Sequence, residues 1–326
     1  MYRISNTSSH MPSTFFLIGI PGLEDYSILT SISFCVLYIS GLLGNSLMLY
    51  IIWAGKSLHG PMYFFLAMLA LNDLAFSTSI TPKMLEIFWR NNGNINASAC
   101  LTQMFFVHFL SVIESGILTA MAYDRYVAIC CPLRYTSILT YIVLEKIALS
   151  ILVRAFVTIV PIPFLVSRLH YCGVDVVLHS YCDHMAVVNV ACDDKRVDSI
   201  YALILSLSIT GFDLMFIGLS YIMILGTIFQ LPSRGAQNKA VGTCGSHICV
   251  IIATYLPGIF TFVTYRFAQK TIPHSVHIFL ANIYILFPTF LNPIIYGVRT
   301  KQIQDSFLKM LQVYQKATMD FRAGHH

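Results

Sequence analysis

Residues 100–125 read CLTQMFFVHFLSVIESGILTAMAYDR, an apolar stretch that carries one acid near its middle and ends on an Asp-Arg pair. As an α-helix, which rises about 1.5 Å per residue, this stretch covers roughly 38 Å. The hydrocarbon core of a bilayer is about 30 Å thick. If Cys100 lies at one boundary, Arg125 emerges at the other, and the stretch therefore predicts a membrane-spanning helix.

The composition extends this prediction to the whole chain. The 326 residues are 56% hydrophobic and only 11% charged, with a mean hydropathy of +0.71. Soluble domains carry about 25% charged residues, so this chain has too few charges to cover a water-exposed surface. The composition therefore indicates an integral membrane protein.

Apolar runs of about 20 residues cross a bilayer as helices, and the sequence contains seven of them. Arg154 interrupts the fourth run and Pro257 the sixth, and proline is tolerated in a membrane helix with a kink. The sequence predicts an all-α bundle of seven transmembrane helices over 27–297, preceded by segment 1–26 and followed by a short amphipathic helix and tail over 298–326. The expected spans are 27–54, 61–85, 100–125, 143–166, 198–229, 239–264 and 274–297.

The charges near the helix ends orient this bundle. Lys and Arg are moderately enriched on the side that carries the C-terminus, which the positive-inside rule assigns to the cytoplasm. Two Asn-x-Ser/Thr sequons, at Asn6 and Asn96, both fall on the opposite side. We therefore expect an extracellular N-terminal segment, a cytoplasmic C-terminal segment, and glycans on both asparagines.

Cysteines mark the long extracellular loop between the fourth and fifth spans. Four of the nine cysteines fall on the extracellular side: Cys100, Cys172, Cys182 and Cys192. An even number of cysteines in an oxidising compartment predicts two disulfides, and the residues alone leave three pairings open. The alternative is a metal site, because His170, His179 and His184 lie among these cysteines. Their spacing fits no compact zinc pattern, so a loop pinned over the bundle by disulfides is favoured.

Two carboxylates lie deep in the predicted bilayer. Asp73 is about 18 Å along its helix from Pro61, and Glu114 is about 17 Å from Arg125, so both acids lie at the same depth. Two ionised carboxylates close together in a low dielectric repel each other. Three arrangements remain open: a cation between the acids, one shared proton, or two separately hydrogen-bonded acids. Asp213 is a third buried acid, for which the sequence indicates no partner.

The stretch MAYDRYVAICCPLRY (121–135) resembles the third-helix signature of olfactory receptors, a branch of the rhodopsin-like G-protein-coupled receptors. The loop segment HSYCDHMAVV (179–188) resembles the class I, or fish-like, receptors, and family 52 in particular. Asp183 and Asn189 depart from the Glu and Lys expected there. The regularity of the motifs is also typical of a consensus sequence. Five further motifs resemble the family and occur in the family's order, so the resemblance extends over nearly the whole chain. They are GN (44–45), LHGPMYFFLAMLALND (58–73), SY (220–221), KAVGTCGSHICVI (239–251) and NPIIYGVRTKQI (292–303).

The resemblance implies a rhodopsin-like bundle that switches between two states. In the resting state Arg125 is expected to pair with Asp124; on activation the sixth helix swings outward and Arg125 turns toward Tyr221 and a bound G protein. Tyr255 occupies the toggle position of the sixth helix. The family implies a stimulatory olfactory-type G protein and a rise in cyclic AMP. The implied switch residues are Asp124, Arg125, Tyr126, Tyr221, Tyr255 and Tyr296.

The resemblance also bears on the buried acids and the loop cysteines. It supports a sodium ion between Asp73 and Glu114, below the ligand pocket. The oxygen shell of this ion would be completed by Asn45, Ser111 and Asn292. The implied disulfides are Cys100–Cys182 and Cys172–Cys192.

A bundle of this type binds its ligand between the third, fifth, sixth and seventh helices, under the long loop. Arg266 lies near the outer end of the sixth helix, and its planar guanidinium suits a carboxylate. The resemblance matches this position to the acid-binding Arg of class I receptors, so the expected ligand is a small or medium-chain aliphatic carboxylic acid. The other expected pocket residues are Gln103, His108, Phe109, Val112, Leu203, Leu207, Ile259 and Val263.

Arg266 and His108 also allow purely structural interpretations. Arg266 is also consistent with a water-facing helix end that pairs with a loop acid such as Asp183, and His108 with a core histidine whose hydrogen bonds are satisfied.

Other functional classes fit less well. A channel or transporter that uses Asp73, Glu114 and Asp213 would leave the inner-end motifs without a purpose, and the chain lacks inverted repeats. The same receptor fold sensing a non-odorant metabolite or a peptide outside olfactory tissue remains open. No nucleophile–base constellation indicates an enzyme. The expected partners are the acid, the G protein and membrane lipid, without nucleic acid, in a multi-pass plasma-membrane protein.

Overall fold

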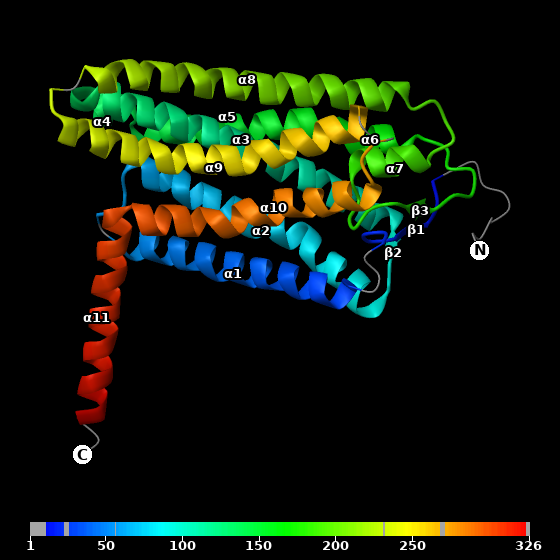
Figure 1. The fold of residues 1–326 in the computed structure, drawn as a ribbon, viewed down its shortest axis with the longest axis horizontal. Helices are drawn as coiled ribbons and strands as arrows, with labels where there is room; N and C mark the ends of the chain where they lie inside the picture. The colour runs from blue at the N-terminus through cyan, green and yellow to red at the C-terminus, as the bar shows by residue number, and fades with distance from the viewer. Residues whose placement is uncertain (1–10, 23–25, 56, 231, 268–270, 324–326) are drawn as a thin grey trace.

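The computed structural model describes residues 11–22, 26–55, 57–230, 232–267 and 271–323. Over this part of the chain seven helices are long and apolar enough to cross a membrane, as the sequence predicts. They lie side by side as one elongated bundle (Figure 1). These helices are α1 (Ser27–Ala54), α2 (Pro61–Arg90), α3 (Ala97–Cys130), α5 (Tyr141–Ile159) continued by α6 (Pro161–Ser167), α8 (Arg196–Phe229), α9 (Arg234–Phe267) and α10 (His274–Arg299).

Several helices extend beyond the apolar runs that predict them. The run 100–125 lies within α3, which begins at Ala97 and ends at Cys130. Hydrophobicity detects only the part of a helix inside the hydrocarbon, whereas the ends of the helix depend on local capping. The side chain of Asn96 accepts a hydrogen bond from the Ser98 N–H at 2.9 Å and so caps α3. Pro61 occupies the first turn of α2, where its missing N–H costs nothing.

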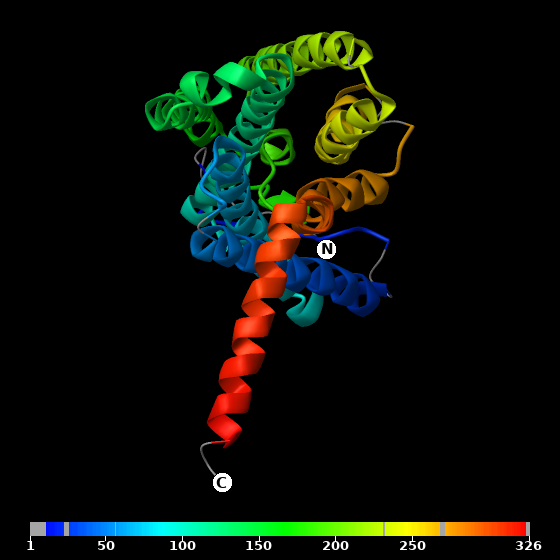
Figure 2. The same ribbon diagram turned by 90° about the vertical axis from the view of Figure 1, so that its left-hand side faces the viewer.

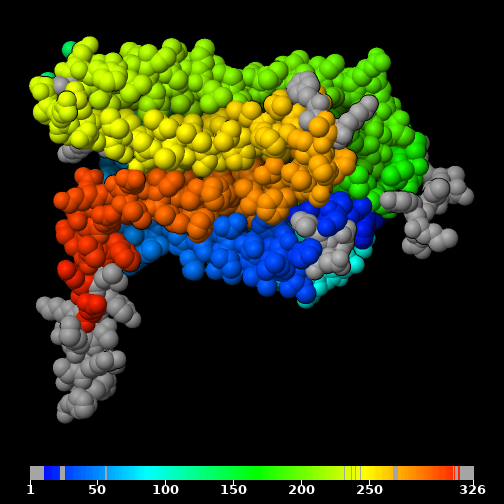
Figure 3. Space-filling view, in the orientation of Figure 1, coloured from blue at the N-terminus to red at the C-terminus, as the bar shows by residue number. Residues whose placement is uncertain are grey.

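The helices differ in how much of their surface the bundle encloses. Of the seven, α3 is the most enclosed and α8 the least. Along one face of the molecule α9 lies between α8 and α10, and α10 lies between α9 and α1 (Figure 3). Residues of α3 therefore reach the centre of the bundle, whereas most of α8 is left for lipid.

A small sheet covers the extracellular end of the bundle. Strand β1 (Thr14–Leu17) pairs antiparallel with β2 (Asn94–Asn96) and parallel with β3 (Val176–Val177). Phe15 and Leu17 are buried in the main hydrophobic cluster, and the Phe15 ring packs edge-on against Tyr171. The sequence places this segment outside the membrane but predicts no strand, because four residues without an alternating pattern give no periodic signal.

The cytoplasmic side carries three further helical segments. The 3-10 turn Pro132–Arg134 and α4 (Tyr135–Ile138) follow α3. Helix α11 (Lys301–Ala323) points away from the bundle (Figures 1 and 2). The prediction of a short amphipathic helix followed by an irregular tail is therefore wrong in length, since the helix continues to Ala323. Ile303 in its first turn is buried against the bundle.

Candidate functional site

Two disulfides hold the long extracellular loop over the bundle. Cys182 is bonded to Cys100 at the outer end of α3, and Cys172 is bonded to Cys192 within the loop. These are the pairs that the family resemblance implies. Gln103 reinforces the first disulfide, because its amide oxygen accepts the Cys182 N–H at 3.0 Å and its amide nitrogen donates to the Ser79 carbonyl at 2.9 Å. Both ends of the Gln103 side chain are thus occupied by backbone.

The loop carries a short helix, α7 (His184–Val190), over the bundle. The carboxylate of Asp183 caps this helix by accepting the Ala186 N–H at 3.1 Å. Histidines surround the cap: the ring centroids of His108 and His184 are 6.3 Å apart, and the pKa of Asp183 is lowered because neighbouring imidazoles outweigh the effect of burial. The Nε2 atom of His108 is buried and has no hydrogen-bond partner within the described residues. A core histidine with satisfied hydrogen bonds is therefore not what the structure places there.

Arg266 lies at the outer end of α9 and reaches toward α8. Its Nη1 donates to the Ser199 hydroxyl at 2.9 Å, and its Nη2 donates to the Ser199 carbonyl at 2.5 Å. The guanidinium also lies 5.7 Å from the ring centroid of Phe262. No carboxylate in the described part of the chain pairs with Arg266, so the alternative of an Asp183 partner is not what the structure shows. Both hydrogen-bonded groups of Ser199 are neutral.

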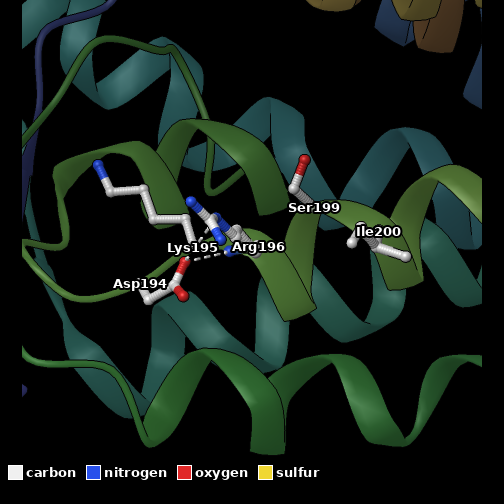
Figure 4. Close-up of a pocket in the computed structure, with 5 residues that line it drawn as sticks. All are labelled: Asp194, Lys195, Arg196, Ser199 and Ile200. Atoms are coloured by element: carbon white, nitrogen blue, oxygen red, sulfur yellow. Dashed lines mark hydrogen bonds and ion pairs between the residues drawn. The ribbon is translucent and has the colours of Figure 1, made fainter.

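An open depression of about 330 Å³ lies beside Ser199 at the outer end of α8. It is lined by Asp194, Lys195, Arg196, Ser199 and Ile200, and Figure 4 shows their side chains. The guanidinium of Arg196 forms a long ion pair with Asp194, at 3.8 Å, and its backbone N–H donates to the same carboxylate at 3.0 Å. The Arg266–Ser199 contact therefore lies next to an opening to solvent.

The structure buries only some of the apolar residues that are expected to line the ligand pocket. Phe109 stacks on Phe105, and Val112 is buried. In contrast, Leu207, Ile259 and Val263 are 59%, 39% and 43% exposed, so these three side chains do not line a closed cavity. Apolarity alone suggested them, and it cannot separate a pocket wall from a surface that faces lipid. Leu203 is half-buried on α8.

A buried ion pair below this region gives Asp213 its partner. Asp213 on α8 accepts hydrogen bonds from Arg154 on α5 at 2.6 and 3.1 Å. Ser115 on α3 donates to the same carboxylate and lies 2.9 Å, oxygen to oxygen, from the hydroxyl of Tyr255 on α9. Four helices thus meet at one polar network that ends at the expected toggle residue. A basic and an acidic residue in neighbouring apolar spans were the signal that sequence reasoning missed.

The two mid-membrane acids lie close together with separate partners. Asn292 donates to Asp73 at 2.9 Å, and Thr254 donates to Glu114 at 3.2 Å. One oxygen of Asp73 and the amide oxygen of Asn292 are buried without a partner in the described residues. Unpaired oxygens beside two carboxylates suit a small cation. Asn45 instead donates to the Gly41 and Thr289 carbonyls, and Ser111 bonds to Tyr284, so these two side chains are occupied elsewhere.

At the cytoplasmic end, Arg125 donates to Asp124 through two nitrogens, at 3.0 and 2.6 Å. Tyr135, the first residue of α4, donates to the second oxygen of the same carboxylate at 2.7 Å. Tyr221 does not contact Arg125; its hydroxyl lies 2.8 Å from Nδ1 of His247 on α9. The sequence predicts the pair but not the contacts of Tyr135 and His247. Tyr135 ends the same stretch, yet it reaches Asp124 only because the turn Pro132–Arg134 folds the chain back, and His247 comes from α9.

The remaining switch and modification residues have simpler placements. Tyr296 is buried with an unpartnered hydroxyl among the described residues, and Tyr126 is half-buried beside Tyr123. Asn96 lies exposed on β2 at the extracellular end, whereas Asn6 lies outside the described residues. Glycosylation at both asparagines stays a prediction.

Seven membrane-spanning helices, a loop pinned to the third by a disulfide and an Asp-Arg pair at its inner end define a seven-transmembrane receptor. The family model for olfactory receptors matches residues 34–314, and the chain belongs to this family. Olfactory receptors are G-protein-coupled receptors of the plasma membrane rather than enzymes.

Curated relatives confirm the resemblance to family 52. The chain is 50% identical to human olfactory receptor 52K1 over 308 residues, which cover 94% of this chain and 98% of the relative. It is 50% identical to human olfactory receptor 52A5 over 314 residues, covering 96% and 99%. Identity to human olfactory receptor 52D1 is 48% over 310 residues, covering 95% and 98%.

Proposed function

We propose that this receptor is activated by small or medium-chain aliphatic carboxylic acids and raises cyclic AMP through a stimulatory olfactory-type G protein. The observation that supports the ligand class is the state of Arg266. This guanidinium is half-buried beside the loop and is held by the neutral groups of Ser199 instead of by an acid. A carboxylate offers two acceptors to the same two nitrogens, and charge-assisted hydrogen bonds are roughly twice as strong as neutral ones.

A ligand carboxylate that replaced Ser199 as the hydrogen-bond partner of Arg266 would change the contacts that hold the outer end of α9. The contact with Ser199 ties the outer end of α9 to α8, and the ligand would replace this tie with one to the bound acid. Pro257 lies within α9 between Arg266 and the inner end, next to Tyr255. Rotation of α9 at Pro257 would move Tyr255 and so disturb its hydrogen-bond network with Ser115 and Asp213. By linkage, the ligand shifts the equilibrium only by its difference in affinity for the two states.

In this proposal the cytoplasmic half of the bundle passes the conformational change on to the G protein. The Arg125–Asp124 pair, with Tyr135 on the same carboxylate, holds the resting state. Outward movement of α9 would separate His247 from Tyr221, leaving Tyr221 available to Arg125. A sodium ion held by Asp73, Glu114 and Asn292 would stabilise the resting arrangement, since a bound cation screens the repulsion between the two carboxylates.

The test is a cyclic AMP assay with straight-chain acids of two to twelve carbons and the matching alcohols. Acids are expected to activate and alcohols to fail. Arg266→Ala should abolish the response at equal surface expression, and Arg266→Lys should restore it only in part, because an ammonium lacks the planar fork. Arg90→Ala is the matched control, since this arginine is exposed at the extracellular end of α2 and does not line the depression beside Ser199. Equal activity of alcohols, or unchanged potency in Arg266→Ala, would refute the ligand proposal.

A further inference from the structure

Four histidines interact electrostatically with Asp183: His179 and His184 in the loop, His108 on α3 and His277 on α10. We call these four residues the imidazole cluster. Ring centroids are 6.3 Å apart for His108 and His184 and also for His179 and His277. The Nε2 atoms of His108, His179 and His184 are all buried, with no hydrogen-bond partner in the part of the chain that the structure describes. Buried polar atoms are normally paired, so three unpaired ring nitrogens in one place indicate a site that receives something.

Titratable and charged groups of the loop, α9 and α10 face this cluster. Burial lowers the pKa of His179 and of His184 to about 4, so both rings are neutral at pH 7 in the free receptor. Asp183 is then negative and Arg266 positive, and the region is close to neutral overall. The titratable and charged groups around the cluster are Tyr181 and Asp183 in the loop, Tyr265 and Arg266 on α9, and His274 and Tyr284 on α10.

A carboxylate ligand disturbs this balance. Bound at Arg266, it leaves the region with the two negative charges of ligand and Asp183 against one guanidinium. An uncompensated charge in a buried site is costly, and such a site responds by moving a proton. The neighbouring imidazole of His184 lies close enough to both Asp183 and Arg266 to interact with their charges. Its unpaired Nε2 is a ready proton acceptor.

We propose that in mildly acidic medium the receptor binds a carboxylate together with one proton, and that the imidazole cluster takes up this proton, at Nε2 of His184. The proposal rests on the proposed function, and it adds that the ligand is recognised as an anion plus a proton from water. Protonated His184 then faces Asp183 and the bound anion. A metal ion in the same place is not supported, because the described residues contain no His, Cys, Asp and Glu group arranged to hold one.

The sign of the pH dependence follows from linkage. A nearby anion raises the pKa of an imidazole by about 1–3 units, and the free value for His184 is about 4. Binding of the anion therefore raises the proton affinity of His184. By linkage, lowering the pH must strengthen anion binding over the pH interval between the pKa of His184 with ligand bound and its pKa in the free receptor. In that interval affinity rises by up to about tenfold per pH unit. A rise of about 2.5 units, which brings the pKa of His184 with ligand bound to about 6.5, gives an increase in potency of roughly tenfold between pH 7.5 and pH 5.5.

The experiment compares octanoate with octanesulfonate, which stays ionised at every pH used. Cyclic AMP responses are measured at external pH 7.5 and 5.5 and normalised to direct activation of the cyclase. Both anions should gain roughly tenfold in potency at pH 5.5. Asp183→Asn keeps the cap of α7, because asparagine caps helices as well as aspartate; it should bind more tightly at pH 7.5 and lose the pH dependence. His184→Asn should also lose the pH dependence. His170→Asn, which removes an exposed imidazole that lies beside Asp193, is the control and should behave like wild type.

Each other result overturns the proposal in a distinguishable way. Sulfonate potency that does not change with pH, beside octanoate potency that does, would mean that the neutral acid binds and the cluster takes up no proton. Unchanged pH dependence in both Asp183→Asn and His184→Asn, at normal surface expression, would place the proton elsewhere. A receptor that responds to neither anion at either pH would overturn the proposed function itself, and this proposal with it.

Discussion

Replacing Arg154 by methionine tests how far the ion pair with Asp213 supports the bundle. The Asp213 side chain is fully buried on α8, and Arg154 on α5 is its only cationic partner in the described structure. Gly116 on α3 makes room for the pair, since a Cβ there would lie 2.9 Å from Nη2 of Arg154. In Arg154→Met the carboxylate keeps Ser115 as a donor but loses its counter-charge.

The expected loss is large because a buried charge is left unpaired. Removing one partner of a buried ion pair costs about 3–5 kcal/mol, whereas replacing both partners by apolar residues is often neutral. With about 2–4 °C lost per kcal/mol in chains of this general size, Arg154→Met should lower the melting temperature by roughly 6–20 °C. The double variant Arg154→Met/Asp213→Leu should recover most of this loss. Asp213→Leu alone should cost less than Arg154→Met, because the Arg154 side chain is 27% exposed and can turn toward lipid headgroups.

The assay is thermal unfolding of the purified receptor in detergent, with surface expression measured in parallel. Arg196→Met serves as the control, since its exposed ion pair should contribute little. If Arg154→Met melts within about 2 °C of wild type, or if the double variant is less stable than Arg154→Met, the ion pair does not carry the stability assigned to it here.

Two further predictions concern the switch and the ion site. Tyr135→Phe removes the 2.7 Å hydrogen bond to Asp124; a loss of about 1 kcal/mol from the resting state should raise basal cyclic AMP roughly fivefold, and unchanged basal activity at equal expression would exclude this role. Replacing sodium by choline in membranes should increase agonist potency in nucleotide-exchange assays if a cation rests on Asp73, Glu114 and Asn292, and Asp73→Asn should remove the difference; equal potency of wild type in both salts would leave the site without an ion.

The seven helices could be predicted from the sequence because a bilayer imposes a strict local requirement. Each span must be apolar and must satisfy its own backbone hydrogen bonds, and both properties are visible in a run of about 20 residues. The helix ends were less accurate, as α3 and α11 show, since capping and packing extend helices into polar surroundings. The disulfide pairs and the Asp124–Arg125 contact were predicted through the family resemblance, not from the residues alone.

The contacts between helices could not be predicted in this way. Arg154 and Asp213 are 59 residues apart, Tyr221 and His247 come from different spans, and β1 pairs with two loops from distant parts of the chain. Sequence by itself determined which segments of this protein enter the membrane and which chemical groups they carry. Only the tertiary structure decided which groups meet, placing Arg266 on Ser199 and four histidines around Asp183. Hydrophobicity is a property of one segment, whereas the rotation and depth of a helix relative to its neighbours depend on how all of them pack.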